Sequence, residues 1–161
     1  MFLEVFDRNV TRESMAQKHA RIFQDYGIKI FENSREKFLA GVEDVTPPLL
    51  VTIKGKKIVN LIGHSCLIYL VDEKYFIIKD STPFTNIHAY DLAGNWIWDI
   101  ESVKDPEGDS VEYFMGIDNI LTDDKGIRQL IVNFFPFAFL TELETGKNTK
   151  LYKIEDISDF H

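Results

Sequence analysis

The chain has 161 residues, 45% of them hydrophobic and 27% charged, which is enough for one domain with a hydrophobic core. No apolar run approaches the roughly 20 residues that span a bilayer, so the composition argues against a membrane-spanning helix. The formal net charge of -8 disfavours a protein that binds nucleic acid through phosphate contacts.

The start of the chain and its cysteine content both favour a cytoplasmic protein. MFLEVFDRNV has acids where a secretory signal would have a basic start and a long apolar run. The single cysteine, Cys66, has no second thiol for a disulfide or a Cys-x-x-Cys site, as is common in a reducing compartment.

Residues 1–48 are expected to form a helical N-terminal region within a single domain that spans 1–161. Thr11 is a candidate N-cap, and the pattern ends at Gly27. Five side chains between them recur at helical spacing: Met15, His19, Ile22, Phe23 and Tyr26. Pro47 and Pro48 mark the end of the region, because neither can donate a hydrogen bond to a sheet.

Residues 49–155 change to a strand pattern and predict five β-hairpins. Apolar and β-branched runs flank short polar or glycine-containing turns, which is typical of antiparallel strands. The turns fall near Gly55, Glu73, Gly94, Lys125 and Gly146. In the third hairpin, NIHAYDLAGNWIWDIE, we expect Trp96 and Trp98 to share one face and to pack in the sheet.

Two hairpins share a design and suggest a weak internal repeat. AYDLAGNWIWDIE and LTELETGKNTKLYKIE each have an acid at the strand end, a glycine in the turn and a final Ile-Glu. The spacing of about fifty residues is close to a four-stranded propeller blade, but closed propellers need at least four blades. The expected fold is therefore mainly β (α+β): two blade-like antiparallel sheets packed as a sandwich or partial barrel, with the N-terminal helix over an edge or an open face.

The negative charge is concentrated in one window, 99–124. Nine acids stand there against one base, Lys104, so the window alone has a net charge of -8, while the rest of the chain has 17 acids and 17 bases. Such a window either keeps a small protein soluble or attracts a cationic partner. The candidate interface residues are Asp105, Glu107, Asp109, Glu112, Asp118, Asp123 and Asp124.

Catalytic and metal-binding alternatives are weaker. His64 and Cys66 stand two residues apart, but core-strand sequence surrounds them, so we expect an inert buried thiol. His64 and His88 with Asp80 and Asp91 lack the spacing of a metal site. The segment DPEGD (105–109) lacks the 12-residue spacing of a calcium loop. No catalytic residue, metal site or cofactor is predicted, and we expect no enzyme.

The aromatic segment FFPFAF (134–139) has two interpretations. Four aromatic side chains surround Pro136, which belongs at an edge or a bulge of a sheet. Core packing is the default interpretation, and an exposed ridge that binds a partner is the alternative.

The hairpin NIHAYDLAGNWIWDIE, the acidic loop after it, YFMGID and FLTELETGK resemble small cytoplasmic immunity proteins of bacterial toxin–immunity loci, including contact-dependent growth inhibition. The resemblance implies a non-catalytic inhibitor that binds a cognate toxin domain, such as a nuclease. The expected partner is a protein rather than a nucleic acid or a membrane, and the oligomeric state stays open. The alternative is a structural or adaptor protein with propeller-like sheets and no toxin partner.

Overall fold

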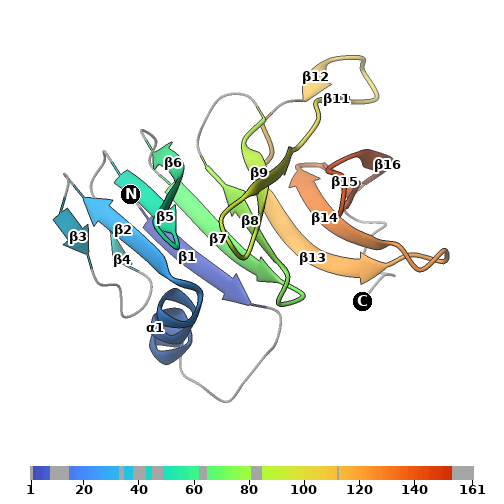
Figure 1. The fold of residues 1–161 in the computed structure, drawn as a ribbon. Helices are drawn as coiled ribbons and strands as arrows, with labels where there is room; N and C mark the ends of the chain where they lie inside the picture. The colour runs from blue at the N-terminus through green and yellow to red at the C-terminus, as the bar shows by residue number, and fades with distance from the viewer. Residues whose placement is uncertain are drawn as a thin grey trace. The chain divides into compact units, whose positions relative to one another are not determined.

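The computed structural model describes residues 2–7, 15–32, 35–37, 43–44, 49–61, 65–80, 85–111 and 113–153. It is mainly β, with several antiparallel sheets, as the sequence predicts (Figure 1). The chain divides into two compact units where the sequence suggested one domain. The first unit is Met1–Thr82 with His88–Ile97, and the second is Pro83–Ile87 with Trp98–His161.

The elements up to the third hairpin form two sheets and one helix. One sheet has the strand order β10-β9-β8-β7-β1-β4, and the other has the order β3-β2-β5-β6. The elements are β1 (Phe2–Asp7), α1 (Met15–Tyr26), β2 (Ile28–Glu32), β3 (Arg35–Lys37), β4 (Glu43–Asp44), β5 (Leu49–Ile53), β6 (Lys56–Leu61), β7 (Ser65–Val71), β8 (Tyr75–Lys79), β9 (Ile87–Asp91) and β10 (Trp96–Asp99).

Besides α1, the described part of the region 1–48 holds four strands, β1 to β4. In this region the sequence predicts an extended piece only for IKIF (28–31), which lies in β2, and it does not predict β1, β3 or β4. The strand β1 pairs in parallel with β7, with Phe2 opposite Ser65, and β2 pairs with β5. Both pairings join segments far apart in the chain, so the local sequence pattern does not reveal them. Thr11 lies outside the described residues, as do Pro47 and Pro48.

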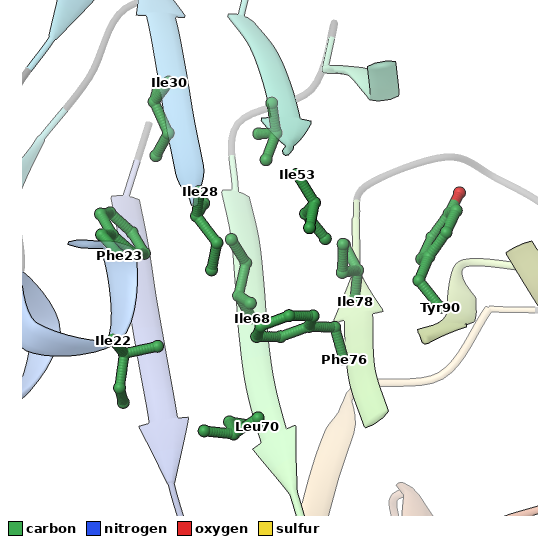
Figure 2. Close-up of a cluster of buried hydrophobic side chains, with 11 residues drawn as sticks. Ile22, Phe23, Ile28, Ile30, Ile53, Ile68, Leu70, Phe76, Ile78 and Tyr90 are labelled. Carbon is green, nitrogen blue, oxygen red and sulfur yellow. The ribbon is translucent and has the colours of Figure 1, made fainter. Parts of the chain in front are cut away.

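One apolar core joins α1 to both sheets of the first unit. It contains Ile22 and Phe23 of α1, isoleucines of β2, and apolar side chains of β5, β7, β8 and β9 (Figure 2). Tyr26 packs edge-on against Phe76, with ring centroids 5.5 Å apart. Ile22, Phe23 and Tyr26 lie on one face of α1 because Tyr26 is four residues from Ile22 and three from Phe23, and residues three and four apart share a helix face.

The second unit contains a four-stranded antiparallel sheet of order β13-β14-β15-β16 and a small hairpin of β11 and β12. Its elements are β11 (Val103–Lys104), β12 (Ser110–Val111), β13 (Gly116–Thr122), β14 (Arg128–Phe134), β15 (Phe137–Glu142) and β16 (Asn148–Lys153). Ile131 lies opposite Leu140 in a cluster with Ala138. The central strands β14 and β15 are buried along most of their length.

The predicted hairpins are present. The β5–β6, β7–β8, β13–β14 and β15–β16 pairs are antiparallel, and β9 and β10 are neighbours in their sheet. Trp98 is buried, as predicted, but the prediction for Trp96 was wrong, because its side chain is 59% exposed. Trp96 is the first residue of β10, the end strand of its sheet, so neighbouring strands flank it on one side only.

Among the described glycines of the second unit, Gly146 has the least space for a side chain, because it lies against the indole of Trp98. The indole Nε1 of Trp98 donates a 2.9 Å hydrogen bond to the carbonyl of Leu143. Gly146 lies against the indole, and a Cβ built on it would be 2.5 Å from Cε3 of the ring. Its φ of 73° also disfavours any other residue, so glycine is required here for two separate reasons.

We predict that Gly146→Ala destabilises the protein more than Gly126→Ala. Both glycines have positive φ, but a Cβ on Gly126 meets nothing within 4 Å. Gly126→Ala should cost only the backbone strain, about 1–2 kcal/mol. Gly146→Ala adds an overpacking cost of about 1–3 kcal/mol against Trp98. Urea denaturation followed by Trp fluorescence measures the free energy of unfolding of both variants. An equal loss of stability in the two would contradict the contact between Gly146 and Trp98.

Candidate functional site: the acidic turns

Three turns, at 91–95, 105–109 and 123–127, have the sequence Asp-x-x-Gly-x and share one geometry. In each turn the Asp carboxylate accepts hydrogen bonds of 2.9 Å from the backbone N–H groups of the third and fifth residues. The Asp N–H donates to the carbonyl of the fifth residue, and the glycine N–H donates to the Asp carbonyl. The glycines have φ of 86°, 89° and 81°.

The chemistry of the first and fourth residues explains why these turns recur. An Asp side chain reaches the backbone two residues on, and glycine adopts positive φ without strain. The repeat inferred from the sequence compared hairpins about fifty residues apart, and it missed this shorter motif. The spacing of Asp and Gly in DLAG, DPEG and DDKG is the signal that could have found it.

Two of the turn carboxylates titrate below their usual range. Burial alone would raise the pKa of Asp91, but hydrogen bonds from Asn95 and Ala93 and the charge of Lys56 outweigh it, so the pKa is lowered. The pKa of Asp123 is lowered by the backbone N–H of Ile127, by the side chain of Gln129 and by Lys125. Both carboxylates are therefore stabilised in the charged form.

The three turns differ at their second, third and fifth positions. In the turn at Asp91 the fifth residue, Asn95, donates from its side chain to the carboxylate at 2.9 Å and is itself bonded to Lys56. In the turn at Asp105 the same position holds Asp109, which cannot donate when ionised. The hairpin β11–β12 therefore has three neighbouring acids at its tip.

The structure divides the predicted interface residues into two kinds. Asp105 and Asp123 bind the backbone of their turns, and Asp118 accepts a 2.6 Å hydrogen bond from the side chain of Asn133. The side chains exposed on the turns, with no turn-forming bond described, belong to Glu107, Asp109 and Asp124. Glu112 lies outside the described residues.

In the sequence the seven candidate acids form one group, and the structure separates the described ones by what their carboxylates bind. Reversing the charge at Asp105 or Asp123 would remove the acceptor of two backbone N–H groups and break the turn. A test of the surface charge therefore uses Glu107, Asp109 and Asp124, whose side chains are exposed and form no described turn bond.

The tip residues Asp105, Glu107 and Asp109 are the one group of possible metal ligands in the described part of the chain. One oxygen of each lies within 4.8 Å of the others. Three carboxylate oxygens suit a hard cation, but Ca²⁺ takes six to eight oxygen ligands, and an oxygen of Asp105 is already shared by two N–H groups. The arrangement is chiefly a concentration of negative charge.

The alternative histidine and cysteine sites are only partly brought together. His88 Nε2 lies 2.9 Å from Oδ2 of the buried Asp80, whereas the carboxylate of Asp91 serves its own turn. Cys66 lies in β7, but its side chain is outside the described part, as is His64 altogether. Of these candidate residues, the structure therefore brings His88 and Asp80 together.

The aromatic segment 134–139 is buried in part, as the default interpretation predicts, and exposed in part. Phe139 is buried, whereas Phe135 is 72% exposed in the turn between β14 and β15. Phe134 and Phe137 are half-buried and pair across that turn. Pro136 lies in the turn itself rather than at an edge or a bulge.

We predict that Asp123→Ala is less stable than Asp124→Ala at neutral pH and that the gap narrows in acid. The lowered folded pKa of Asp123 gives stability that is present above the unfolded Asp value of about 3.9 and is lost as the pH falls through the folded value. Thermal unfolding followed by circular dichroism between pH 7 and pH 3 measures the gap. Equal stability at pH 7, or a gap that widens in acid, would contradict the role of the turn.

Comparison of the chain with protein-family models, with curated proteins and with solved structures found no match. In the described part of the chain, no helix has the length and apolar character needed to cross a membrane.

Proposed function

We propose that the chain is a non-catalytic binding protein that neutralises a cognate toxin domain, such as a nuclease, through the acidic turns of the second unit. The observation that carries the proposal is the acid content of the turn 105–109. The turn itself needs only Asp105 and Gly108, yet Glu107 and Asp109 add two further carboxylates beside the first.

The turn at Asp91 shows what the same motif looks like when folding alone decides its residues. Leu92 packs against the core, and Asn95 donates to the carboxylate. In the turn at Asp105, Asp109 replaces that donor with a like charge, which costs local stability. Residues that break a local folding rule are expected where function requires them.

Rigidly held charges at a hairpin tip are suited to the capture of a cationic protein. The backbone of the tip is fixed by the hydrogen bonds of Asp105, while the side chains of Glu107 and Asp109 stay exposed. Charges of one sign accelerate encounter with a partner of the opposite sign by about 10–10³-fold at low salt. A nuclease toxin needs a basic face for its phosphate substrate, and that face is the complement of this tip.

The remaining features of the proposal follow from the same function. An inhibitor of a toxin delivered from a neighbouring cell acts in the cytoplasm and needs no cofactor. Its finer architecture would be two blade-like sheets packed as a sandwich or partial barrel, which present loops to the partner. An adaptor protein without a toxin partner is the competing proposal, and for it the acidic tip would serve solubility alone.

We predict that Asp109→Asn stabilises the protein and slows its association with the partner. Asparagine can donate to Asp105 as Asn95 donates to Asp91, and it removes one of three neighbouring carboxylates. Thermal unfolding at low ionic strength measures the gain in stability. The control Asp124→Asn removes the same charge outside the cluster and should leave the unfolding midpoint unchanged. Loss of stability in Asp109→Asn would contradict the account of the tip.

We further predict that the triple reversal Glu107→Lys, Asp109→Lys and Asp124→Lys cuts the association rate by about tenfold or more at low salt. The partner to be tested is the C-terminal domain of a secreted protein encoded by the adjacent upstream gene, where that gene encodes one. Stopped-flow association is measured at about 0.01 M and about 0.15 M ionic strength, where the Debye length falls from about 30 to about 8 Å. The rate of the wild type should fall with salt, and the rate of the variant should change little.

The matched control is a second triple reversal with the same change in net charge outside the window: Asp25→Lys, Glu36→Lys and Glu144→Lys. These acids are exposed, and the surface pairs of Asp25 with Arg21 and of Glu36 with Lys29 contribute little to stability. The control should keep most of the wild-type rate. No binding of the domain, or equal and salt-independent rates in all three proteins, would reject the proposal in favour of the adaptor.

A further inference from the structure

A buried asparagine clamps the segment that follows the acidic tip. The side chain of Asn86 donates to the carbonyl of Phe114 and accepts from its N–H, both at 2.8 Å. The Phe114 ring is fully buried and packs edge-on against Phe139, with centroids 5.8 Å apart. The amide of Asn86 thus satisfies both backbone groups of Phe114, as a neighbouring strand would.

The clamp fixes two exposed apolar side chains beside Phe114. Successive residues of an extended segment point to opposite sides, so Tyr113 and Met115 face away from the buried ring. They are 39% and 57% exposed, respectively. The N–H of Met115 also donates to the carbonyl of Asn133 at 2.9 Å, which ties the segment to β14.

Phe135 lies at the same end of the four-stranded sheet. Gly116 is opposite Asn133, so Met115, the residue before β13, and Phe135, the residue after β14, lie at the same end of this strand pair. Phe135 is 72% exposed, so core packing does not account for a phenylalanine at this position. Of the five large apolar side chains that are exposed in the described part, this end carries Tyr113, Met115 and Phe135. We call these three residues the apolar anchor.

Acids flank the anchor on both sides along the chain. Asp109 precedes Tyr113 by four residues, at most about 14 Å, and Asp118 follows Met115 by three residues, at most about 11 Å. The described bases near this end are Lys153, whose Cα is opposite Phe137, and Lys104, which lies in the same hairpin as the three acids of the tip. The anchor is therefore an apolar site with a predominantly acidic rim, which is complementary to an apolar side chain surrounded by Lys and Arg.

We propose that Tyr113, Met115 and Phe135 hold an apolar side chain of a basic protein surface, while the acidic tip directs the encounter. This inference rests on the proposed function, which it extends from the encounter to the bound complex. Aromatic residues and methionine are enriched at such interfaces, and Met adapts its shape to the group that it receives. Because the clamp fixes Met115 before binding, little ordering of that backbone opposes the complex.

The test uses three fluorescein-labelled peptides and measures anisotropy. The first peptide has lysine flanks and a central Leu-Phe pair, the second replaces that pair with Ser-Ser, and the third replaces the lysines with glutamates. We expect the first to bind about tenfold more tightly than the other two. Phe135→Ser and Met115→Ser should each weaken its binding about fivefold or more.

The control variant is Ile127→Ser, at the opposite end of the β13–β14 pair, where a similarly exposed apolar side chain lies outside the anchor. It should bind the first peptide with an affinity within about twofold of the wild type. Met115→Ser leaves the turn at Phe135 intact, and the urea unfolding midpoint of every variant, followed by tryptophan fluorescence, checks that it is folded.

Four outcomes would overturn the anchor. They are wild-type affinity in both anchor variants, no preference for the first peptide, self-association that depends on Phe135, and Phe135-dependent binding to phosphatidylcholine vesicles. If the anchor variants bind the first peptide like the wild type while toxin association still depends on salt, the anchor is rejected and the proposed function stands. If the anchor variants weaken peptide binding but the protein does not bind the toxin domain, the proposed function is rejected and the anchor stands.

Discussion

The hydrogen bonds from two backbone N–H groups to one Asp carboxylate are the interaction on which the functional features of this chain depend. They fix the turns at Asp91, Asp105 and Asp123 with the same geometry. Because Asp and Gly satisfy the turn, its three other positions are free to serve other purposes. Core packing uses one of them at Leu92, and the proposed interface uses two of them in the turn at Asp105. The same local chemistry therefore gives a structural turn in one place and a charged tip in another.

Hydrogen bonds between side chains and the backbone also determine where the apolar side chains of the second unit are exposed. The amide of Asn86 replaces a strand beside Phe114, and the burial of Phe114 forces its two neighbours outward. Without such a clamp, an extended segment that shows Tyr and Met to water would lower its free energy by turning them inward. The clamp makes that rearrangement costly, because it would leave the buried amide of Asn86 without its partners.

The local part of this structure could be predicted from the sequence, and the long-range part could not. Alternating apolar residues around Gly55, Gly126 and Gly146 were sufficient to place hairpins, because a hairpin is encoded within about 15 residues. The pairing of β1 with β7 and the bonds of Asn86 to Phe114 depend on partners distant in the chain, which periodicity does not identify. For the same reason the acids were recognised as a group, but their division into turn-forming and exposed members was not. That division depends on which backbone N–H groups each carboxylate meets.

Charge and apolar surface make unequal contributions to a complex of the kind proposed, and this chain places them on neighbouring segments. The attraction of exposed charges extends over several ångströms and speeds the encounter, but salt and water reduce its contribution to the bound state. An apolar contact acts only after water has left it, so it does not guide the encounter, but it slows dissociation. A tip of acids alone would give a complex that forms and separates quickly. In the proposed complex, the exposed Tyr113, Met115 and Phe135 would supply the lifetime that the acids lack, and this role would account for large apolar side chains kept in water.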